Sequence, residues 1–457
     1  MLHRYTHNGG SGRSTAIPVI RAVARWSRRS RHQTSSPLCN FPPVLSCVLS
    51  RQPFVDTMTE ATPVIRLRKN EERRLKAGHL WIYANEIDTR QTPLKELPAG
   101  AACVVEDSRG KPLGRALLSP HSLIAARVYS RDVKQELSRS FFKKRIEQAL
   151  ALRETLFSDP CYRLVYGEAD GLPGLVVDRF NDVLVVQTGS GAMEAHLDII
   201  VSALDAVLSP SHIIAKNEAA AREIEGMERY TKALKGELLE EVSLTENGAH
   251  FTAPLAEGQK TGWFYDHRAA RQKMAPLAKG ARVLDVFSYC GGWGVQAALA
   301  GAESVTCVDA SETAIEYVHR NAEQNGVGDK VGSIQGDAFA AMKQLIADGE
   351  KYDLVILDPP AFVKRKKDFK NGLAGYHAIN ELAMRLVKPG GYLVSASCSM
   401  HMPANRLLDV IQSSARHIDR SVQIIGYEGQ GPDHPVHPAI PETSYLKSWF
   451  CRVSFSQ

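Results

Sequence analysis

The stretch that decides the fold is Val283-Leu284-Asp285-Val286-Phe287-Ser288-Tyr289-Cys290-Gly291-Gly292-Trp293-Gly294. Its apolar start predicts a buried β-strand, its glycines predict a turn, and the run Val295-Gln296-Ala297-Ala298-Leu299-Ala300 that follows predicts a helix. Glycines at such a turn let the backbone approach a ligand closely at the amino end of a helix. The stretch therefore predicts a ligand-binding strand–turn–helix unit of an α/β sheet.

Strand-like and helix-like segments also alternate in the sequence around this unit. From about residue 276 onward, apolar strand-like runs alternate with helix-like segments, which is typical of a doubly wound α/β domain. The expected strands are Arg282–Val286, Ser304–Val308, Val331–Gln335, Tyr352–Leu357, Gly391–Ala396 and a late strand near Ser448–Val453.

Two smaller units precede this domain. Residues 64–129 carry short β-like runs, so we expect a small barrel-like domain with a hairpin formed by residues 101–106 and 113–118. Residues 141–157 have helical spacing and would bridge to a small α+β domain. Its expected elements are strands at 163–168, 175–179, 183–187 and 213–216, and a helix near 194–208.

The net charge of +6 arises in the first 55 residues, which hold eight arginines and no lysine or acidic residue and so leave the remainder at −2. Binding of nucleic acid must then be argued from local basic clusters. The Arg- and Ser-rich leader is typical of a transit peptide, of an extension upstream of a true start at Met58, or of a disordered basic arm. We leave it out of the fold.

The eight cysteines are scattered and form no Cys-x-x-Cys pair. This disfavours a disulfide framework and a zinc site and indicates a reducing compartment, which we take to be the cytoplasm. We expect no metal, because His434 and His437 lie among prolines that indicate a rigid turn. No apolar run approaches the roughly 18 residues that a membrane-spanning helix needs, so we expect none.

Acidic residues accompany the glycine turn. Asp285 before the glycines disfavours a pyrophosphate ligand and suits the cationic amine and sulfonium of S-adenosylmethionine. Asp309 follows the next strand, where it can accept ribose hydroxyls, and Asp337 follows the third, where an adenine amino group would lie. A dinucleotide site and a ligand-free turn are the alternatives. The residues expected to bind the cofactor are Asp285, Phe287, Gly291, Gly292, Gly294, Asp309 and Asp337.

Two expected neighbouring strands end in reactive groups. The run 354–357 ends in Asp358-Pro359-Pro360, which is typical of methyltransferases acting on a planar nitrogenous ring, and the run 391–396 leads to Cys398. A thiolate that adds to carbon 6 of cytosine makes carbon 5 nucleophilic, and a base then removes the carbon-5 proton. We expect Cys398 and Asp358 to be catalytic, although an ordinary core cysteine is the alternative.

Two clusters of basic residues would hold RNA phosphates. One loop follows the paired prolines, and a second cluster with nearby aromatic residues lies near the start of the barrel-like domain. Solvated basic loops are the alternative. The residues expected to bind substrate are Pro359, Pro360, Phe362, Lys364, Arg365, Lys366, Lys367, Arg68 and Lys69.

These motifs together resemble the bacterial large-subunit (23S) ribosomal RNA cytosine-C5 methyltransferase family. The resemblance runs from about Val64 to Val453 and includes Gly167-Glu168-Ala169-Asp170-Gly171, Thr261-Gly262-Trp263-Phe264-Tyr265-Asp266-His267-Arg268, Asp358-Pro359-Pro360-Ala361-Phe362 and Ser397-Cys398-Ser399. It implies a PUA domain at 58–131, a central domain at 132–250 and a class I (Rossmann-like) methyltransferase domain at 251–457, after a leader at 1–57. It also implies a homodimer, Cys398 as nucleophile, and Thr261 and Arg268 near the cofactor.

One position departs from the wider class of cytosine-C5 RNA methyltransferases. Many of them carry a second cysteine directly after the paired prolines, where this chain has Ala361. Asp358 or water would then take the carbon-5 proton. A purine-nitrogen methyltransferase, in which Phe362 grips a flipped purine, and a non-catalytic RNA-binding assembly factor remain the rival interpretations.

Overall fold

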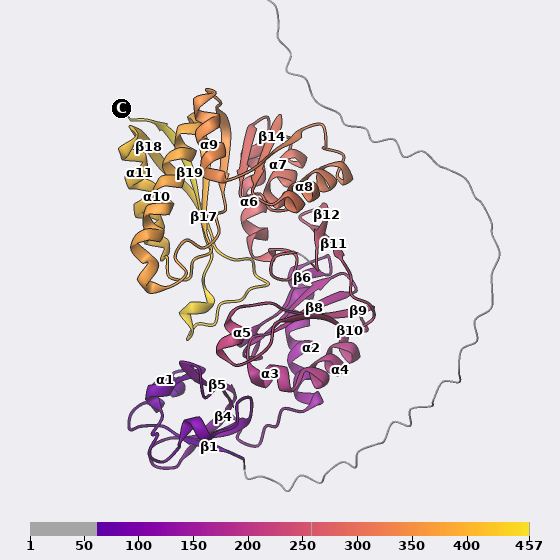
Figure 1. Ribbon diagram of the computed structural model, residues 1–457, viewed down its shortest axis with the longest axis vertical. Coiled ribbons are helices and arrows are strands. Elements are labelled where there is room, and N and C mark those ends of the chain that lie inside the picture. The colour runs from indigo at the N-terminus through magenta and orange to yellow at the C-terminus, as the bar shows by residue number, and fades with distance from the viewer. Residues whose placement is uncertain (1–61, 257, 457) are drawn as a thin grey trace, which may run out of the picture. The chain divides into compact units, whose positions relative to one another are not determined.

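The computed structural model describes residues 62–256 and 258–456, so the predictions for the leader lie outside the described residues. The first domain is a five-stranded sheet with its own apolar core, drawn in indigo in Figure 1. The predicted hairpin is confirmed, since β3 and β4 pair antiparallel. In sheet order its strands are β1 (Val64–Arg66), β3 (Ala102–Glu106), β4 (Pro112–Leu118), β5 (Ile124–Ser130) and β2 (Trp81–Tyr83), and α1 (Glu72–Lys76) lies between β1 and β2.

The central domain is a second five-stranded sheet. In sheet order its strands are β10 (Tyr230–Lys235), β9 (His212–Asn217), β8 (Val183–Thr188), β7 (Leu175–Phe180) and β6 (Cys161–Tyr166). Its helices are α2 (Arg139–Leu156), α3 (Gly191–Ala195), α4 (Leu197–Leu208) and α5 (Ala221–Ile224).

One predicted strand of this domain lies two residues earlier in the chain than expected, at Cys161–Tyr166. The strand expected at 163–168 ends at Tyr166, because Gly167 adopts φ 51° and Asp170 Oδ2 accepts a hydrogen bond from Tyr166 N at 2.7 Å. These features turn residues 167–170 into a 3₁₀ turn.

A hairpin of β11 (Glu241–Glu246) and β12 (Ala249–Pro254) connects the central sheet to the last domain, so the boundary expected between residues 250 and 251 falls inside β12. Phe251 of this hairpin belongs to a continuous apolar core that also contains Phe180 of the central sheet and Val283 of the last sheet. The two domains therefore share one core.

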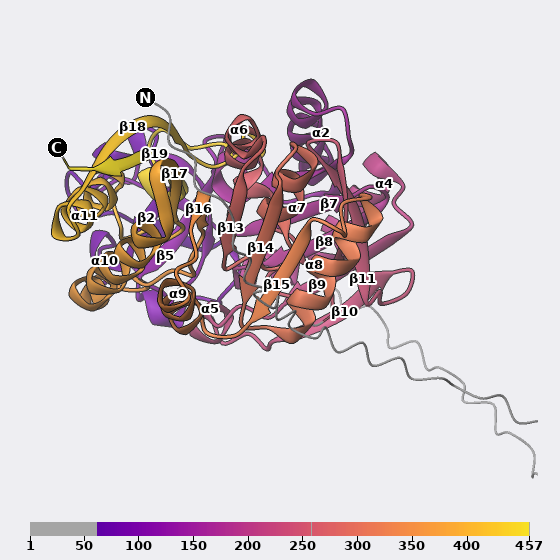
Figure 2. The same cartoon turned by 90° about the horizontal axis from the view of Figure 1, so that it is seen from above.

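The last domain is a seven-stranded sheet, and the predicted α/β architecture is confirmed. Five strands run parallel, as Figure 2 shows, and β19 lies antiparallel between β17 and β18. In sheet order the strands are β15 (Val331–Gln335), β14 (Ser304–Asp309), β13 (Arg282–Val286), β16 (Tyr352–Leu357), β17 (Val387–Ser397), β19 (Lys447–Phe455) and β18 (Arg420–Glu428).

Helices cover both faces of this sheet. Alternate strand residues face opposite sides, so Val283 packs in one core and Leu284 in the other. On the first face lie α6 (Arg268–Ala278), α7 (Gly292–Leu299) and α8 (Glu312–Gln324), and on the second lie α9 (Ala338–Ala347), α10 (Phe369–Leu386) and α11 (Ala404–His417). The carboxyl ends of the parallel strands meet at one edge, which is where such sheets bind ligands.

Within residues 62–256 and 258–456, no helix is both long enough and apolar enough to cross a membrane. Six cysteines lie in these ranges, and all six are free thiols.

Candidate active site

The turn after β13 is strained. Phe287 and Tyr289 adopt φ of 67° and 47°, a left-handed conformation that costs a non-glycine residue about 1–3 kcal/mol. The N–H groups of Phe287 and Ser288 both donate to Val308 O of β14, at 2.9 and 3.0 Å, and these bonds hold the turn against the neighbouring strand. Stored strain of this kind is typical of a ligand site.

The glycines of the turn are required by the packing of the protein itself. Gly291 adopts φ 81°. A Cβ at Gly294 would lie 2.5 Å from Cys307 Sγ and 3.1 Å from Asp285 Oδ2, so any larger residue would push α7 away from β13 and β14. The glycines thus bring the amino end of α7 onto the strand ends.

Asp285 is fully buried beside this helix. Its Oδ2 accepts a hydrogen bond from Gly294 N at 2.8 Å, whereas its buried Oδ1 has no partner among the described residues. Burial raises the pKa of Asp285 to about 7, the Gly294 N–H lowers it, and the charges of Asp358 and Asp309 raise it further. An unpaired buried carboxylate oxygen fits a ligand that brings a cationic donor, such as the amine of S-adenosylmethionine.

The other two predicted cofactor carboxylates end the neighbouring strands. Asp309 accepts hydrogen bonds from Tyr289 N and Ser311 N, both at 2.9 Å, so it also fixes the strained turn. Asp337 is exposed and caps α9 by accepting from Ala340 N at 2.9 Å. Both side chains thus accept hydrogen bonds that stabilise nearby backbone, and their contacts to ribose and adenine stay predictions.

Asp358 is held by two side chains that the sequence analysis did not single out. Trp293 Nε1 donates to its Oδ2 at 3.1 Å, and His267 Nε2 lies 3.0 Å from its Oδ1. Trp293 belongs to α7, and His267 belongs to the 3₁₀ turn Tyr265–His267 before α6. The carboxylate therefore has a fixed orientation, and the side chain of Asp358 remains 18% exposed.

Cys398 lies beside the prolines, as the predicted strand order requires. β16 and β17 pair in parallel with Leu357 opposite Ser395, and Cys398 Sγ lies 3.9 Å from Pro359 O. Burial raises the pKa of the Cys398 thiol to about 11, and Lys260 lowers it whereas Asp358 raises it. The thiol is thus protonated at neutral pH before any ligand binds.

Lys447, another residue that the sequence analysis missed, approaches the same turn from β19. It pairs with Ser397 across the strands and donates from Nζ to Ser399 O at 2.5 Å. Burial lowers the pKa of Lys447 to about 8, although a thiolate at Cys398 would raise it. A buried cation near the thiol favours the thiolate.

The turn of Cys398 is tied to the proline loop by hydroxyl groups. Tyr376 Oη lies 2.7 Å from Ser397 Oγ and 2.9 Å from Ser399 Oγ, and Val363 N donates to Ser399 Oγ at 3.2 Å. Phe362 packs on Tyr376, with ring centroids 4.9 Å apart. The ring of Phe362 is therefore engaged within the protein, and its predicted contact to substrate gains no support from this position.

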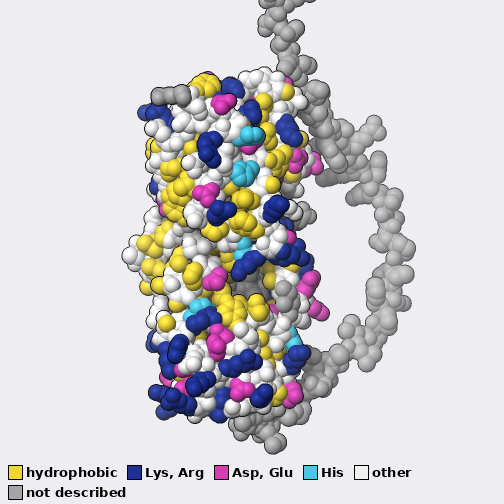
Figure 3. Space-filling view, turned by 90° about the vertical axis from the view of Figure 1, so that its left-hand side faces the viewer, with side chains coloured by type: hydrophobic (Ala, Val, Ile, Leu, Met, Phe, Trp, Pro, Cys, Tyr) yellow, Lys and Arg dark blue, Asp and Glu magenta, His cyan; other side chains and the backbone are white. Residues whose placement is uncertain are grey.

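The predicted basic residues lie in two separate places. Residues 364–367 are exposed beyond the prolines, and Arg365 pairs with Asp368 at 2.9 Å. Arg68 and Lys69 are exposed in the first domain, where Arg68 Nε donates to Ile87 O at 3.1 Å. Figure 3 shows Lys and Arg side chains gathered over the lower part of the face in view, at the height of the first domain in Figure 1.

Two predicted cofactor residues point elsewhere. The hydroxyl of Thr261 donates to Asp178 Oδ2 of β7 at 2.5 Å. The guanidinium of Arg268 bonds to Cys161 O and lies over the rings of Phe157 and Tyr265. Both residues therefore join the last domain to the central sheet, and their contact with the cofactor stays a prediction.

The two histidines near the end of the chain have local partners. His434 Nδ1 lies 3.0 Å from Asp433 Oδ1, and His437 Nδ1 accepts a hydrogen bond from Ala439 N at 3.3 Å. Among the residues placed in the structure, no group of three or more His, Cys, Asp or Glu side chains could hold a metal ion.

The chain is similar to known proteins over most of its length. A family model described as a PUA-like domain matches residues 65–131, and one described as an S-adenosylmethionine-dependent methyltransferase matches residues 175–442. The chain is 35% identical over 397 residues to ribosomal RNA large subunit methyltransferase I of Photobacterium profundum, and 36% identical to that of Aliivibrio fischeri; each match covers 86% of this chain and all of the relative.

Solved structures share the fold. A candidate SAM-dependent methyltransferase from Streptococcus mutans superposes with a TM-score of 0.73 at 21% identity, over 86% of this chain and 100% of its own. A second methyltransferase structure, complexed with SAH, also gives 0.73 at 20% identity and covers 86% of this chain and 99% of its own.

Proposed function

Since the chain belongs to the family of S-adenosylmethionine-dependent methyltransferases that carry a PUA-like domain, we propose that it methylates carbon 5 of a cytosine in large-subunit ribosomal RNA. The observation that carries the proposal is the thiol of Cys398 lying 3.9 Å from Pro359 O, next to the oriented carboxylate of Asp358. Such a substrate implies action in the cytoplasm or wherever ribosomes are assembled.

S-adenosylmethionine, when bound, supplies an electrophilic methyl group. Asp285 is the residue best suited to hold it, because its buried Oδ1 receives no hydrogen bond from the residues that the structure describes. Phe287 and the N–H groups at the amino end of α7 line the same turn, and Asp309 and Asp337 extend it along the sheet edge. The finer assignment of these contacts is part of the proposal.

Cys398 acts as the nucleophile. Its proton passes to water while the positive charge of Lys447 stabilises the thiolate, and the sulfur bonds to carbon 6 of the cytosine. Carbon 5 thereby gains the electron density with which it takes the methyl group. The carbon-5 proton then passes to Asp358 or to water, the bond between sulfur and carbon 6 breaks, and the thiolate is restored. Ala361 brings no second thiol to this step.

Asp358 also binds the edge of the base. A carboxylate held by Trp293 and His267 can accept a hydrogen bond from the exocyclic amine of cytosine without reorienting during the reaction. The exposed cations at 364–367 would hold phosphates at the mouth of the site, and Arg68 and Lys69 would hold a more distant part of the RNA.

The test has a cellular and a chemical part. Mass mapping of ribosomal RNA from a strain that lacks the gene should show one cytosine without its methyl group, and adding back the purified protein should restore it. RNA carrying 5-fluorocytosine at that position should form a covalent complex with the protein, because fluorine cannot leave as a proton does. A purine as the affected base, or methylation without a thiol adduct, would favour the purine-nitrogen rival.

A further inference from the structure

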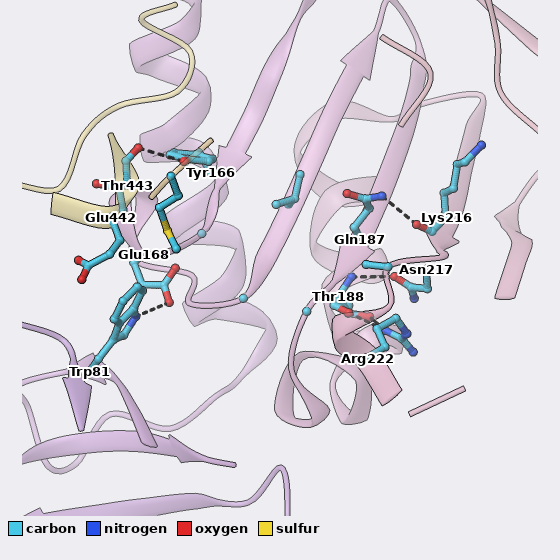
Figure 4. Close-up of a pocket in the computed structure, with 16 residues that line it drawn as sticks. Trp81, Tyr166, Glu168, Gln187, Thr188, Lys216, Asn217, Arg222, Glu442 and Thr443 are labelled. Atoms are coloured by element: carbon cyan, nitrogen blue, oxygen red, sulfur yellow. Dashed lines mark hydrogen bonds between the residues drawn. The ribbon is translucent and has the colours of Figure 1, made fainter. Parts of the chain in front are cut away.

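A cavity lies close to the turn that follows β17 and carries Cys398. It measures about 300 Å³, at the small end of ligand pockets, and it is formed by the central sheet together with Trp81 of the first domain and Met400 and Glu442 of the last. Figure 4 shows its two walls, with Trp81, Tyr166, Glu168 and Glu442 on one side and Gln187, Thr188, Asn217 and Arg222 on the other.

The cations of this cavity are committed to the protein. Arg222 donates to Thr188 Oγ1 at 2.8 Å and to Glu228 O at 2.9 Å, and it lies 3.2 Å from Glu194 Oε2. Lys216 Nζ donates to Gly258 O at 2.7 Å and to the carbonyls of Leu255 and Ala256. Arg127, which lies 3.6 Å from Glu168 Oε1 and 3.8 Å from Glu225 Oε1, is paired as well. A phosphate would therefore find carboxylates here and, among the described residues, only cations that are already paired, so the cavity is unsuited to it.

The groups left to a ligand are ring surfaces and hydrogen-bond acceptors. Gln187 donates from Nε2 to Lys216 O at 3.0 Å, which leaves its Oε1 on the cavity side in Figure 4. Glu168 already accepts from Trp81 Nε1 at 2.8 Å, an interaction that fixes the indole, and Glu442 is exposed at the rim. Tyr166 is fixed by a hydrogen bond from its hydroxyl to Thr443 O at 3.1 Å.

Aromatic rings beside acceptor groups match an unpaired nucleobase that carries donors. Proteins recognise splayed-out RNA bases by stacking them on aromatic side chains and bonding to their Watson–Crick edge. Guanine offers two adjacent donors on that edge, N1–H and the N2 amine, which fit the two oxygens of one carboxylate. Uracil has no amine and presents two carbonyl acceptors, which the carboxylates would repel.

The position relative to Cys398 points to the same RNA strand. Met400 contributes to the cavity and follows Cys398 by two residues, and consecutive Cα atoms are about 3.8 Å apart, so the two Cα atoms are separated by less than about 8 Å. This residue of the cavity and Cys398 are therefore close enough for one RNA strand to contact both.

We propose that this cavity binds an unpaired guanine of the RNA strand, close to the cytosine that is methylated. The inference rests on the proposed function, and it names a specificity subsite that is separate from the residues of the reacting site.

Two adjacent exposed alanines give a matched test. Ala219 lines the cavity, whereas Ala220 is also exposed and does not line it. Ala219→Trp should fill the opening and raise KM for ribosomal RNA from the gene-deletion strain at least tenfold, with kcat within twofold of the parent. Ala220→Trp should match the parent in both. Equal behaviour of the two variants would overturn the inference.

A small probe identifies the base. Guanosine 5′-monophosphate should inhibit methylation by the parent and by Ala220→Trp, in competition with RNA. Its inhibition of Ala219→Trp should be at least tenfold weaker. Uridine 5′-monophosphate should inhibit the parent far less than guanosine 5′-monophosphate does. Gln187→Met, which removes an acceptor without filling the cavity, should weaken guanosine monophosphate several-fold. Equal inhibition by the two nucleotides would exclude base recognition here.

Failure of the proposed function has a different signature. If the parent protein transfers no methyl group to cytosine, calorimetric binding of guanosine monophosphate to the parent and to Ala219→Trp still reports on the cavity. Binding that Ala219→Trp abolishes would support the guanine site, and binding unaffected by it would overturn the site. Circular dichroism of each variant confirms that it is folded.

Discussion

The two halves of the crevice are held together in different ways. At the ends of β13, β14 and β15, the carboxylates accept hydrogen bonds from backbone N–H groups of the turns and helices that follow these strands, such as Asp285 from Gly294, Asp309 from Tyr289 and Asp337 from Ala340. At the ends of β16 and β17, Asp358 contacts His267 and the turn that carries Cys398 contacts Lys447, and both partners come from distant segments.

This difference teaches where each property of the site originates. The cofactor half is built by a local turn and its strain, whereas the reacting half exists only when α6, α7 and β19 have come together around two strand ends. Variants of the reacting half should therefore change rate and spare cofactor affinity, and variants of the cofactor half should do the opposite.

The largest effect is expected for Cys398→Ala. Removal of a nucleophile should lower methylation by at least about 10⁴-fold, while the dissociation constant of S-adenosylmethionine stays within about twofold. Radiolabelled methyl transfer and calorimetry measure the two quantities. Cys103→Ala, which removes a buried thiol from the first domain, is the control and should keep full activity. Retained activity in Cys398→Ala would refute the thiol mechanism.

Asp358→Asn should come next. The amide keeps the size of the side chain and loses the charge, so kcat should fall by about 10²- to 10³-fold. Cofactor affinity should again change little. A variant with normal kcat and weakened cofactor binding would place Asp358 in the other half of the crevice and break the contrast.

Asp285→Asn should act on affinity. Loss of a charged hydrogen-bond acceptor for the cofactor is worth about 1.5–3 kcal/mol, or roughly 10- to 100-fold in the dissociation constant. Because the pKa of Asp285 is about 7, its carboxylate becomes protonated as pH falls from 8 to 6, and the parent should bind the cofactor more weakly at the lower pH. Calorimetry should show this pH dependence flattened in Asp285→Asn; an unchanged slope would assign it to another group.

The pH dependence of the reacting half should have another origin. The pKa of Cys398 is about 11, so the thiolate fraction and the single-turnover rate should rise by up to about tenfold per pH unit from 6.5 to 8. Above pH 8 the rise should become shallower, because Lys447, with a pKa of about 8, loses the charge that favours the thiolate. A rate that falls over this range would contradict the assignment.

The smallest effect is expected for Trp293→Phe. The ring is kept and one hydrogen bond to Asp358 is lost, which is worth about 0.5–1.5 kcal/mol, or roughly 2- to 12-fold in kcat. His267 still holds the other carboxylate oxygen. A loss as large as that of Asp358→Asn would mean that the indole itself contacts the substrate.

The sequence predicted the parallel strands of the last domain closely, because most of them carry buried apolar residues, as Tyr352–Leu357 does. It did not reveal β18, an edge strand whose side chains are largely exposed, so that no buried run marks it. Among the site residues, Asp285 and Cys398 could be found from the motif and strand end that carry them. His267 and Lys447 could not, because their role depends on contacts between distant segments.

Thr261 and Arg268 show that position along the chain does not determine which way a side chain points. Both are close in sequence to residues of the crevice, yet their side chains are drawn into the interface with the central sheet by Asp178 and by Cys161 O. Proximity in sequence predicted the segment correctly as part of the site's surroundings, since His267 lies between them. It could not predict which side chain of the segment faces inward.

The apolar core that contains both Phe180 and Val283 has a consequence for how the chain loses its structure. Central sheet and catalytic sheet cannot separate without exposing that core to water, so they should melt in a single cooperative transition. Most buried apolar side chains of the first domain, such as Ile65 and Ile82, form a separate core, and of its buried apolar residues only Leu117 and Tyr129 belong to the core of the central sheet. The first domain should therefore open more readily than the other two. Hydrogen exchange should therefore report fast-exchanging amides in residues 64–130 while the amides of β13 and β8 remain protected together.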